Sequence, residues 1–188
     1  MLKLLLRGHK LVLKTTSIDG TLVPSFAFAD TTSYSGKHHK VGTKVSLVVD
    51  ENGLPLSGQT ACGSTHDITL APQTVDAIPK DIASRVKLML ADKGYDAGSF
   101  RSFLSAQGIG SDIPQRELPI VYRQRLLIHN LTKRKNHKAN VKRFVVERTN
   151  AWTKSFRRLR FRFDYTMLSF TAFLNLAFVV ICVRKLMS

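Results

Sequence analysis

The hairpin that decides the fold reads Lys44-Val-Ser-Leu-Val-Val-Asp-Glu-Asn-Gly-Leu-Pro-Leu-Ser-Gly-Gln-Thr-Ala61. Its two arms, residues 44–49 and 54–61, contain the apolar and β-branched side chains that favour strands. Between them, Asn52-Gly53 is the pair that most favours a two-residue turn between antiparallel strands. The sequence therefore predicts a β-hairpin here, and the other elements are placed around it.

Strands and helices alternate on both sides of this hairpin. Before it, residues 11–18 read as a strand that ends at Asp19-Gly20. After it we expect a helix over 67–78 that is capped by Ser64 or Thr65 and closed by Pro79, a buried strand over 86–91, a helix ending at Gly108, and a short strand over 109–113. This order predicts an α/β fold, a mixed sheet with helices on its faces.

The whole chain reads as one domain, because 188 residues with 44% apolar side chains are enough to form a proper core. We divide it into a sheet-rich core (1–114), a basic connection (115–139) and C-terminal helices (140–188). Residues 165–183 carry no charge and approach the length of a membrane span. Their hydroxyl and amide side chains favour a buried core helix instead, so we expect no membrane association.

The charge points to a polyanionic partner. A net charge of +16 and a pI near 10.3 exceed what solubility requires. Binding to such a partner should weaken steeply with salt, since each neutralised phosphate releases a counterion. Only two cysteines, Cys62 and Cys182, are present, which predicts neither a disulfide framework nor a zinc site. We expect a reducing, cytoplasmic setting.

A single acid stands out in the basic second half. Glu147 is the only carboxylate between Glu117 and Asp164, a stretch that contains fourteen lysines and arginines. Residues 143–154 read as a helix, so Arg143, Glu147 and Lys154 share one face. A carboxylate that holds a metal ion, flanked by cations that bind phosphate, suits a phosphodiester substrate. The alternative is an ion pair between Arg143 and Glu147.

Two further acids follow predicted strands. Asp19 and Asp92 both stand at strand ends, where mixed sheets commonly place function, so we expect them to meet Glu147. Three carboxylates suit Mg²⁺ or Mn²⁺, which prefer oxygen ligands. Two such ions about 4 Å apart would serve an in-line displacement at phosphorus.

Several segments together resemble the DDE transposases of bacterial insertion sequences. They are Ser17-Ile-Asp-Gly-Thr21, Ser35-Gly-Lys-His-His-Lys-Val-Gly-Thr-Lys44, Asp50-Glu-Asn-Gly-Leu-Pro-Leu56, His66-Asp67, Ala91-Asp-Lys-Gly-Tyr-Asp96 and Val146-Glu-Arg-Thr-Asn-Ala-Trp152. The similarity spans nearly the whole chain. The family signature Tyr-x2-Arg-x3-Glu-x6-Lys maps onto Arg143, Glu147 and Lys154 with the expected spacing.

The resemblance implies a ribonuclease H-like mixed sheet flanked by helices, with a C-terminal helical extension. It implies that Asp19, Asp92 and Glu147 are the catalytic metal ligands. The expected chemistry is hydrolysis at an element end, followed by attack of the freed 3′-hydroxyl on target DNA. Arg143 and Lys154 would contact phosphates near the cut strand.

The chain departs from the family pattern in two places. Asn140 occupies the signature tyrosine position, which removes a phenolic contact to phosphate. Only eighteen residues precede Asp19, so we expect the N-terminal DNA-binding region of the family to be missing or supplied by a partner polypeptide or a second copy. The alternative function is a truncated, catalytically inactive DNA-binding relic.

Other cations and one aromatic residue are DNA-binding candidates. Arg148, Arg157 and Arg158 are predicted to contact DNA. Within residues 157–163 the cations would face phosphates and the apolar residues would pack inward, or the run is a solvated basic face. Trp152 suits stacking on an unpaired base, but its helical spacing favours core packing.

Three polar segments have simpler interpretations. His66-Asp67 resembles a metal-binding pair, yet a carboxylate at a helix start also interacts favourably with the helix dipole, which we prefer. Asp96 is expected to cap the following helix. His38-His39 is expected to lie on a solvated basic strand edge.

Overall fold

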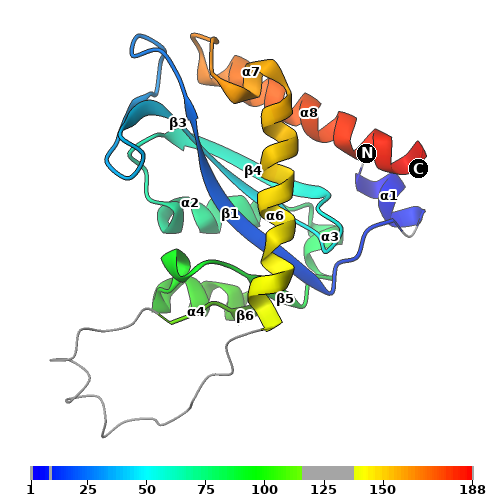
Figure 1. Ribbon diagram of the computed structural model, residues 1–188. Coiled ribbons are helices and arrows are strands. Elements are labelled where there is room, and N and C mark those ends of the chain that lie inside the picture. The colour runs from blue at the N-terminus through cyan, green and yellow to red at the C-terminus, as the bar shows by residue number, and fades with distance from the viewer. Residues whose placement is uncertain (1, 9, 116–137, 188) are drawn as a thin grey trace, which may run out of the picture.

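The computed structural model describes residues 2–8, 10–115 and 138–187 (Figure 1). Its described strands form one six-stranded mixed sheet. They are β1 (Thr15–Pro24), β2 (Ser33–Ser35), β3 (Lys40–Val49), β4 (Pro55–Cys62), β5 (Leu88–Leu90) and β6 (Gly110–Asp112). Strand β3 pairs antiparallel with β1, β2 and β4, while β5 is parallel to both β1 and β6. The central strand β1 therefore joins an antiparallel half to a parallel half.

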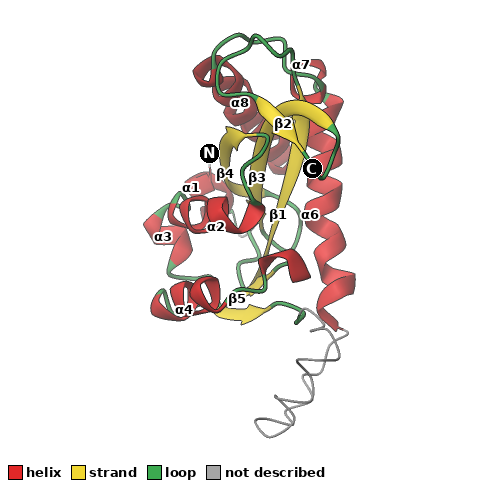
Figure 2. Ribbon diagram, turned by 90° about the vertical axis from the view of Figure 1, so that its left-hand side faces the viewer, coloured by secondary structure: helices red, strands yellow, loops and turns green. Residues whose placement is uncertain are grey.

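Helices cover both faces of the sheet, and Figure 2 shows α2 and α6 on opposite sides of it. The described helices are α1 (Leu2–Arg7), α2 (Asp67–Asp76), α3 (Lys80–Ala83), the 3-10 helix η1 (Lys93–Tyr95), α4 (Gly98–Ala106), α6 (Lys138–Ser155), α7 (Arg157–Arg160) and α8 (Met167–Met187). The α/β fold class predicted from the sequence is confirmed.

Each face of the sheet has its own apolar core, because successive side chains of a strand point to opposite faces. On one face, Ile18 and Val48 pack with Ala71 and Val75 of α2. On the other face, strand residues pack with α7 and α8; this cluster comprises Val23, Val45, Leu47, Leu159, Phe170, Leu174 and Ala177. The sheet is thus fixed between two helical layers.

The hairpin forms as predicted, but its loop is longer than two residues. Val49 pairs with Pro55, which leaves residues 50–54 in the loop. Asp50 closes the loop, since its Oδ1 accepts hydrogen bonds from the backbone N–H groups of Asn52 (2.9 Å) and Leu54 (2.7 Å). Gly53 has φ +86°, and a Cβ there would lie 2.9 Å from Thr149 Oγ1 of α6. The loop is therefore shaped by Asp50 and by the helix packed on it.

Two predicted helix caps are wrong. The residue before α2 is His66, without a side-chain cap, while the hydroxyl of Ser64 accepts a hydrogen bond from Ser33 (2.9 Å) instead. Asp96 does not cap α4; its Oδ1 accepts a hydrogen bond from Arg101 Nη2 at 2.6 Å. In both cases a tertiary partner takes the side chain that local sequence assigned to a helix end.

The C-terminal segment forms the long helix α8, as predicted. In the described part of the chain it is the one helix long and apolar enough to cross a membrane, with a mean hydropathy of 2.0 and 28% of its most apolar window buried. Length and composition alone are weak evidence for a span. A stripe of Phe170, Leu174, Ala177 and Ile181 packs against the rest of the fold. Residues 116–137, most of the predicted basic connection, lie outside the described residues.

Candidate active site

Strand pairing relates the first two predicted acids. Asp19 lies within the central strand β1, not at its end as predicted, because the ladder with β3 continues through Gly20 to Pro24. In the parallel ladder with β5 the last pair is Ser17 with Leu90, so Asp19 and Asp92 each follow the end of this ladder by two residues. Asp92 itself follows β5, and its Oδ1 accepts a hydrogen bond from the N–H of Lys93 at 2.5 Å.

Helix α6 is attached to the sheet by polar contacts. Asn150 donates a hydrogen bond from Nδ2 to Asp19 Oδ2 at 3.0 Å. Thr149 donates to the carbonyl of Gly53 (2.7 Å), and Lys154 donates from Nζ to Thr21 Oγ1 (2.6 Å). Glu147 precedes Asn150 by three residues and therefore lies on a neighbouring part of the same helix face. The contact between Asn150 and Asp19 thus sets the position of Glu147 relative to the strand acids.

Arg143 lies between the two remaining acids. Its Nη2 is 3.2 Å from Glu147 Oε1, and its Nη1 is 4.0 Å from Asp92 Oδ2. Its Nε is buried without a hydrogen-bond partner. The ion pair with Glu147, predicted as the alternative, is therefore present. The side chains of Asp92 and Glu147 are 46% and 49% exposed, so both keep rotational freedom.

Burial dominates the electrostatics of Asp19. It is the largest of several causes that together raise the pKa of Asp19 to about 6; the Asp67 and Glu147 carboxylates act in the same direction, while the Gly20 N–H and Arg143 oppose the change. Burial also lowers the pKa of Lys154. The charged form of the Asp19 carboxyl is therefore only partly compensated in the fold, and a cation bound beside it would stabilise it.

The three acids do not form a complete metal site in this arrangement. Within the described ranges, no group of three or more His, Cys, Asp or Glu side chains is placed to hold a metal ion. Asp92 and Glu147 contact Arg143, whereas Asp19 contacts Asn150. The assignment of all three as metal ligands remains a prediction.

Residues 11–182 match the sequence model of a family described as Transposase DDE domain. The chain belongs to the DDE transposase family. A Burkholderia cepacia protein assigned as a transposase for insertion sequence element IS402 is 33% identical over 149 residues. That alignment covers 75% of this chain and 63% of the relative, so the chain spans less than two thirds of the relative's length.

Solved structures identify the fold of this DDE transposase domain. A chain of the simian T-cell lymphotropic virus intasome in complex with PP2A regulatory subunit B56 gamma has a TM-score of 0.52 at 15% identity, covering 89% of this chain and 48% of that one. The catalytic core domain of BIV integrase has a TM-score of 0.48 at 16% identity, covering 89% and 82%. The similarity to the intasome chain confirms the ribonuclease H-like fold.

Asp67 is a fourth acid near the site that the sequence did not identify as part of it. It begins α2, as preferred, and its Oδ1 is 3.0 Å from Nζ of the buried Lys44. A Cβ on Gly20 would lie 2.1 Å from the same Oδ1. Since Gly20 and Asp19 alternate along β1, Asp67 lies on the face opposite to Asn150. It therefore influences Asp19 through its charge.

Asn150 is the second residue of the transposase domain whose role was missed. Its spacing of three from Glu147 places both on one helix face, which was the available signal. Nothing in the sequence alone indicated a partner in β1. His38 and His39 are exposed in the turn before β3, as expected for a solvated basic segment.

The predicted DNA contacts are distributed over two helices. In α6, Lys154 is half-buried beside Thr21, and Arg148 donates to the carbonyl of Asn52 (2.9 Å) while lying 5.0 Å from the centre of the Trp152 ring. Trp152 is 40% exposed, so the preferred prediction of core packing is wrong.

The basic run after α6 follows the predicted pattern only in part. Leu159 is buried and Arg157 is exposed on α7, as predicted, while Arg158 pairs with Asp164 (3.0 Å) and lies over the Phe173 ring. After α7 the prediction is wrong, because Arg162 is fully buried and Phe163 is 50% exposed. The guanidinium of Arg162 donates hydrogen bonds to Thr43 and Asp30, which hold it inside the fold.

Proposed function

We propose that this chain is the catalytic domain of a DNA transposase that cleaves a strand at an insertion-sequence end and joins the freed 3′-hydroxyl to target DNA. The supporting observation is that one helix contacts all three acids: Arg143 of α6 pairs with Glu147 and approaches Asp92, and Asn150 of the same helix bonds to Asp19. Helix α6 therefore connects acids from three distant parts of the chain.

The residues fit divalent metal ions. Asp19, Asp92 and Glu147 would supply only oxygen ligands, which suit Mg²⁺ or Mn²⁺. Burial penalises the charged form of Asp19, which an added cation would offset, and the half-exposed side chains of Asp92 and Glu147 would be able to turn away from Arg143. When bound, a pair of such ions activates the attacking oxygen and stabilises the leaving one.

The remaining residues would bind and orient the DNA strand. Once Asp92 and Glu147 turn away, the guanidinium of Arg143 is left to bind a phosphate in a bidentate manner. Lys154 places a second cation beside β1. Asn150 would act as a positioning residue, because its amide fixes one oxygen of the Asp19 carboxylate.

Activities of the whole protein extend this proposal. Because the chain spans 63% of its relative, recognition of element ends, self-association and a location on the nucleoid are proposed rather than read from the fold. DNA is the partner in end recognition and in nucleoid association, and the net charge of +16 favours it.

The test is strand cleavage of a supercoiled plasmid that carries the DNA flanking the gene. We expect nicking with Mg²⁺ or Mn²⁺ that disappears in Asp92→Asn, while salt-sensitive DNA binding persists. The matched control is Asp81→Asn, which changes an exposed acid of α3. Nicking that survives Asp92→Asn would overturn the assignment.

One observation favours the alternative, a DNA-binding relic without catalysis. Arg143 occupies the space between Asp92 and Glu147, where an ion would have to bind. A relic would bind DNA with the same salt dependence but would cleave none of the supplied ends with either metal.

A further inference from the structure

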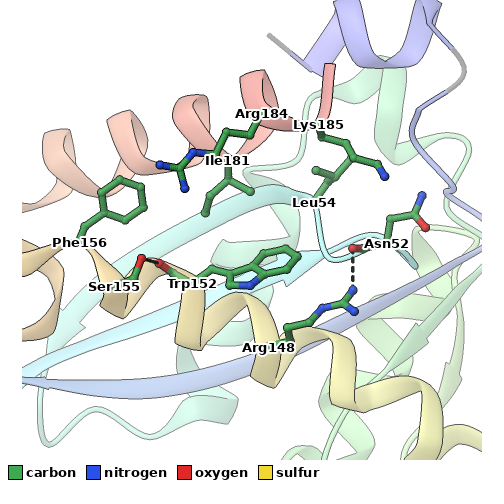
Figure 3. A pocket seen from close by; sticks show the side chains of 9 residues that line it. All are labelled: Asn52, Leu54, Arg148, Trp152, Ser155, Phe156, Ile181, Arg184 and Lys185. Carbon is green, nitrogen blue, oxygen red and sulfur yellow. Dashed lines mark hydrogen bonds between the residues drawn. The ribbon is translucent and has the colours of Figure 1, made fainter. Parts of the chain in front are cut away.

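A pocket lies on a face of α6 other than the one that carries Glu147. It has a volume of about 450 Å³ and is bounded by α6, the 50–54 loop and the end of α8. Side chains that line it include Arg148, Trp152 and Phe156 from α6 and Arg184 from α8. In Figure 3 the indole of Trp152 extends from α6 across the pocket, and the side chain of Arg184 extends from α8 into the same pocket.

The helical spacing separates this pocket from the acids. Arg148, Trp152 and Ser155 follow one stripe of α6, whereas Arg143, Glu147 and Asn150 follow another. At about 100° per residue, the two stripes lie roughly a third of a turn apart around the helix. The pocket is therefore adjacent to the candidate active site without sharing its residues.

The lining combines three kinds of chemistry. All its charged side chains are cations, namely Arg148, Arg184 and Lys185. Its aromatic component is Trp152, which is 40% exposed. Leu54, Phe156 and Ile181 supply apolar surface. A ligand that matches this set carries a flat apolar ring and a negative charge.

The guanidinium of Arg148 already lies against the aromatic ring of Trp152. It lies 5.0 Å from the centre of the Trp152 ring and donates to the Asn52 carbonyl at 2.9 Å. Arg148 also lines the pocket, so its guanidinium can meet a ligand there. A phosphate supplies the acceptor oxygens that a guanidinium binds.

We infer that this pocket binds one unpaired nucleotide of a DNA strand, with the base stacked on Trp152 and the phosphate held by Arg148 and Arg184. Paired bases are stacked on one another inside a duplex, so only an unpaired base can reach an indole in a pocket of this size. The inference rests on the proposed function, because it assumes that a strand leaves the acids and passes around α6.

Trp152 is the only tryptophan of the chain, so its fluorescence reports on this pocket alone. With the metal removed by EDTA, a short thymidine oligonucleotide should quench the emission. A chain of abasic deoxyribose phosphates of equal length should quench it little. Because a stacked base contributes about 1–3 kcal/mol, the oligonucleotide should bind roughly 5- to 160-fold more tightly than the abasic chain.

Variants test the two parts of the pocket by anisotropy of a labelled oligonucleotide. Trp152→Ala should abolish the preference for bases over the abasic chain, and Trp152→Phe should keep most of it. Arg184→Gln should weaken binding of both chains. Arg85→Gln, an exposed arginine after α3 that does not line the pocket, should change neither. Circular dichroism confirms that each variant is folded.

The inference is overturned if both chains bind equally without quenching, or if an acidic peptide quenches as strongly as the oligonucleotide, which would indicate a protein partner. The two proposals fail separately. Base-dependent quenching without metal-dependent nicking would contradict catalysis alone, and nicking without quenching would contradict the nucleotide pocket alone.

Discussion

Replacing Asp19 with asparagine should make the protein more stable at neutral pH. Burial raises the pKa of Asp19 from 3.8 to about 6. The folded state therefore binds more protons than the unfolded state between these values, and stability falls as pH rises through this window. Above pH 6 the full cost of the buried charge is present.

The magnitude follows from the shift. One pKa unit corresponds to about 1.4 kcal/mol, so the ionised carboxylate costs about 2–3 kcal/mol after allowance for its partial exposure. Asp19→Asn should raise the free energy of unfolding by that amount near pH 7.5 and by only about 1 kcal/mol near pH 4.5. The amide retains an oxygen that can accept the hydrogen bond from Asn150.

Urea unfolding followed by Trp152 fluorescence measures this difference at the two pH values. Asp81→Asn on the exposed face of α3 is the control and should change stability at neither pH. A gain that is absent at pH 7.5, or that is equal at both pH values, would refute the reasoning.

Three further predictions concern packing and reactivity. Gly20→Ala should lower the free energy of unfolding by about 1–3 kcal/mol, since its Cβ would lie 2.1 Å from Asp67 Oδ1. In urea unfolding this loss should vanish when Asp67 is also replaced by alanine, and losses that add up in the double variant would contradict the contact. Arg162→Ala should lower the free energy of unfolding by about 3–5 kcal/mol, because the fully buried guanidinium donates hydrogen bonds to the Asp30 carboxylate and to three other oxygens. A loss below about 1 kcal/mol in the same assay would disprove this role. Burial raises the pKa of Cys182 to about 11. A thiol reagent at pH 8 should therefore label Cys62 first in the native protein and both cysteines equally in urea. Equal labelling rates of the two cysteines in the native protein would be inconsistent with this burial.

Local patterns predicted where strands form. The β3–β4 hairpin has its partner strand nearby in sequence, and the short apolar strand before Asp92 formed even though its partners β1 and β6 are distant. The position of Asp19 within β1 was missed, because the strand is extended by pairing with β3 and no local signal marks its end. Sequence patterns locate strands better than they locate strand ends.

Predictions of side-chain burial failed where a partner distant in the sequence determines it. Arg162 is buried because Asp30 and Thr43, far away in the sequence, accept its hydrogen bonds. Trp152 is exposed because α8 approaches α6 only closely enough to form a pocket. Of the candidate site, the residue types and the shared face of Glu147 were predictable, whereas the hydrogen bond from Asn150 to Asp19 depends on the assembled fold.

Pairing with β3 gives the candidate site one rigid member and two adjustable ones. Asp19 is held in register by its pairing with Leu47 of β3, while Asp92 follows the end of a strand and Glu147 projects from a helix docked by hydrogen bonds. Any rearrangement that admits a substrate must therefore move Asp92 and Glu147 toward a stationary Asp19. The positions of Asp92 and Glu147 therefore depend on the loop after β5 and on α6, whereas the position of Asp19 is fixed by the sheet.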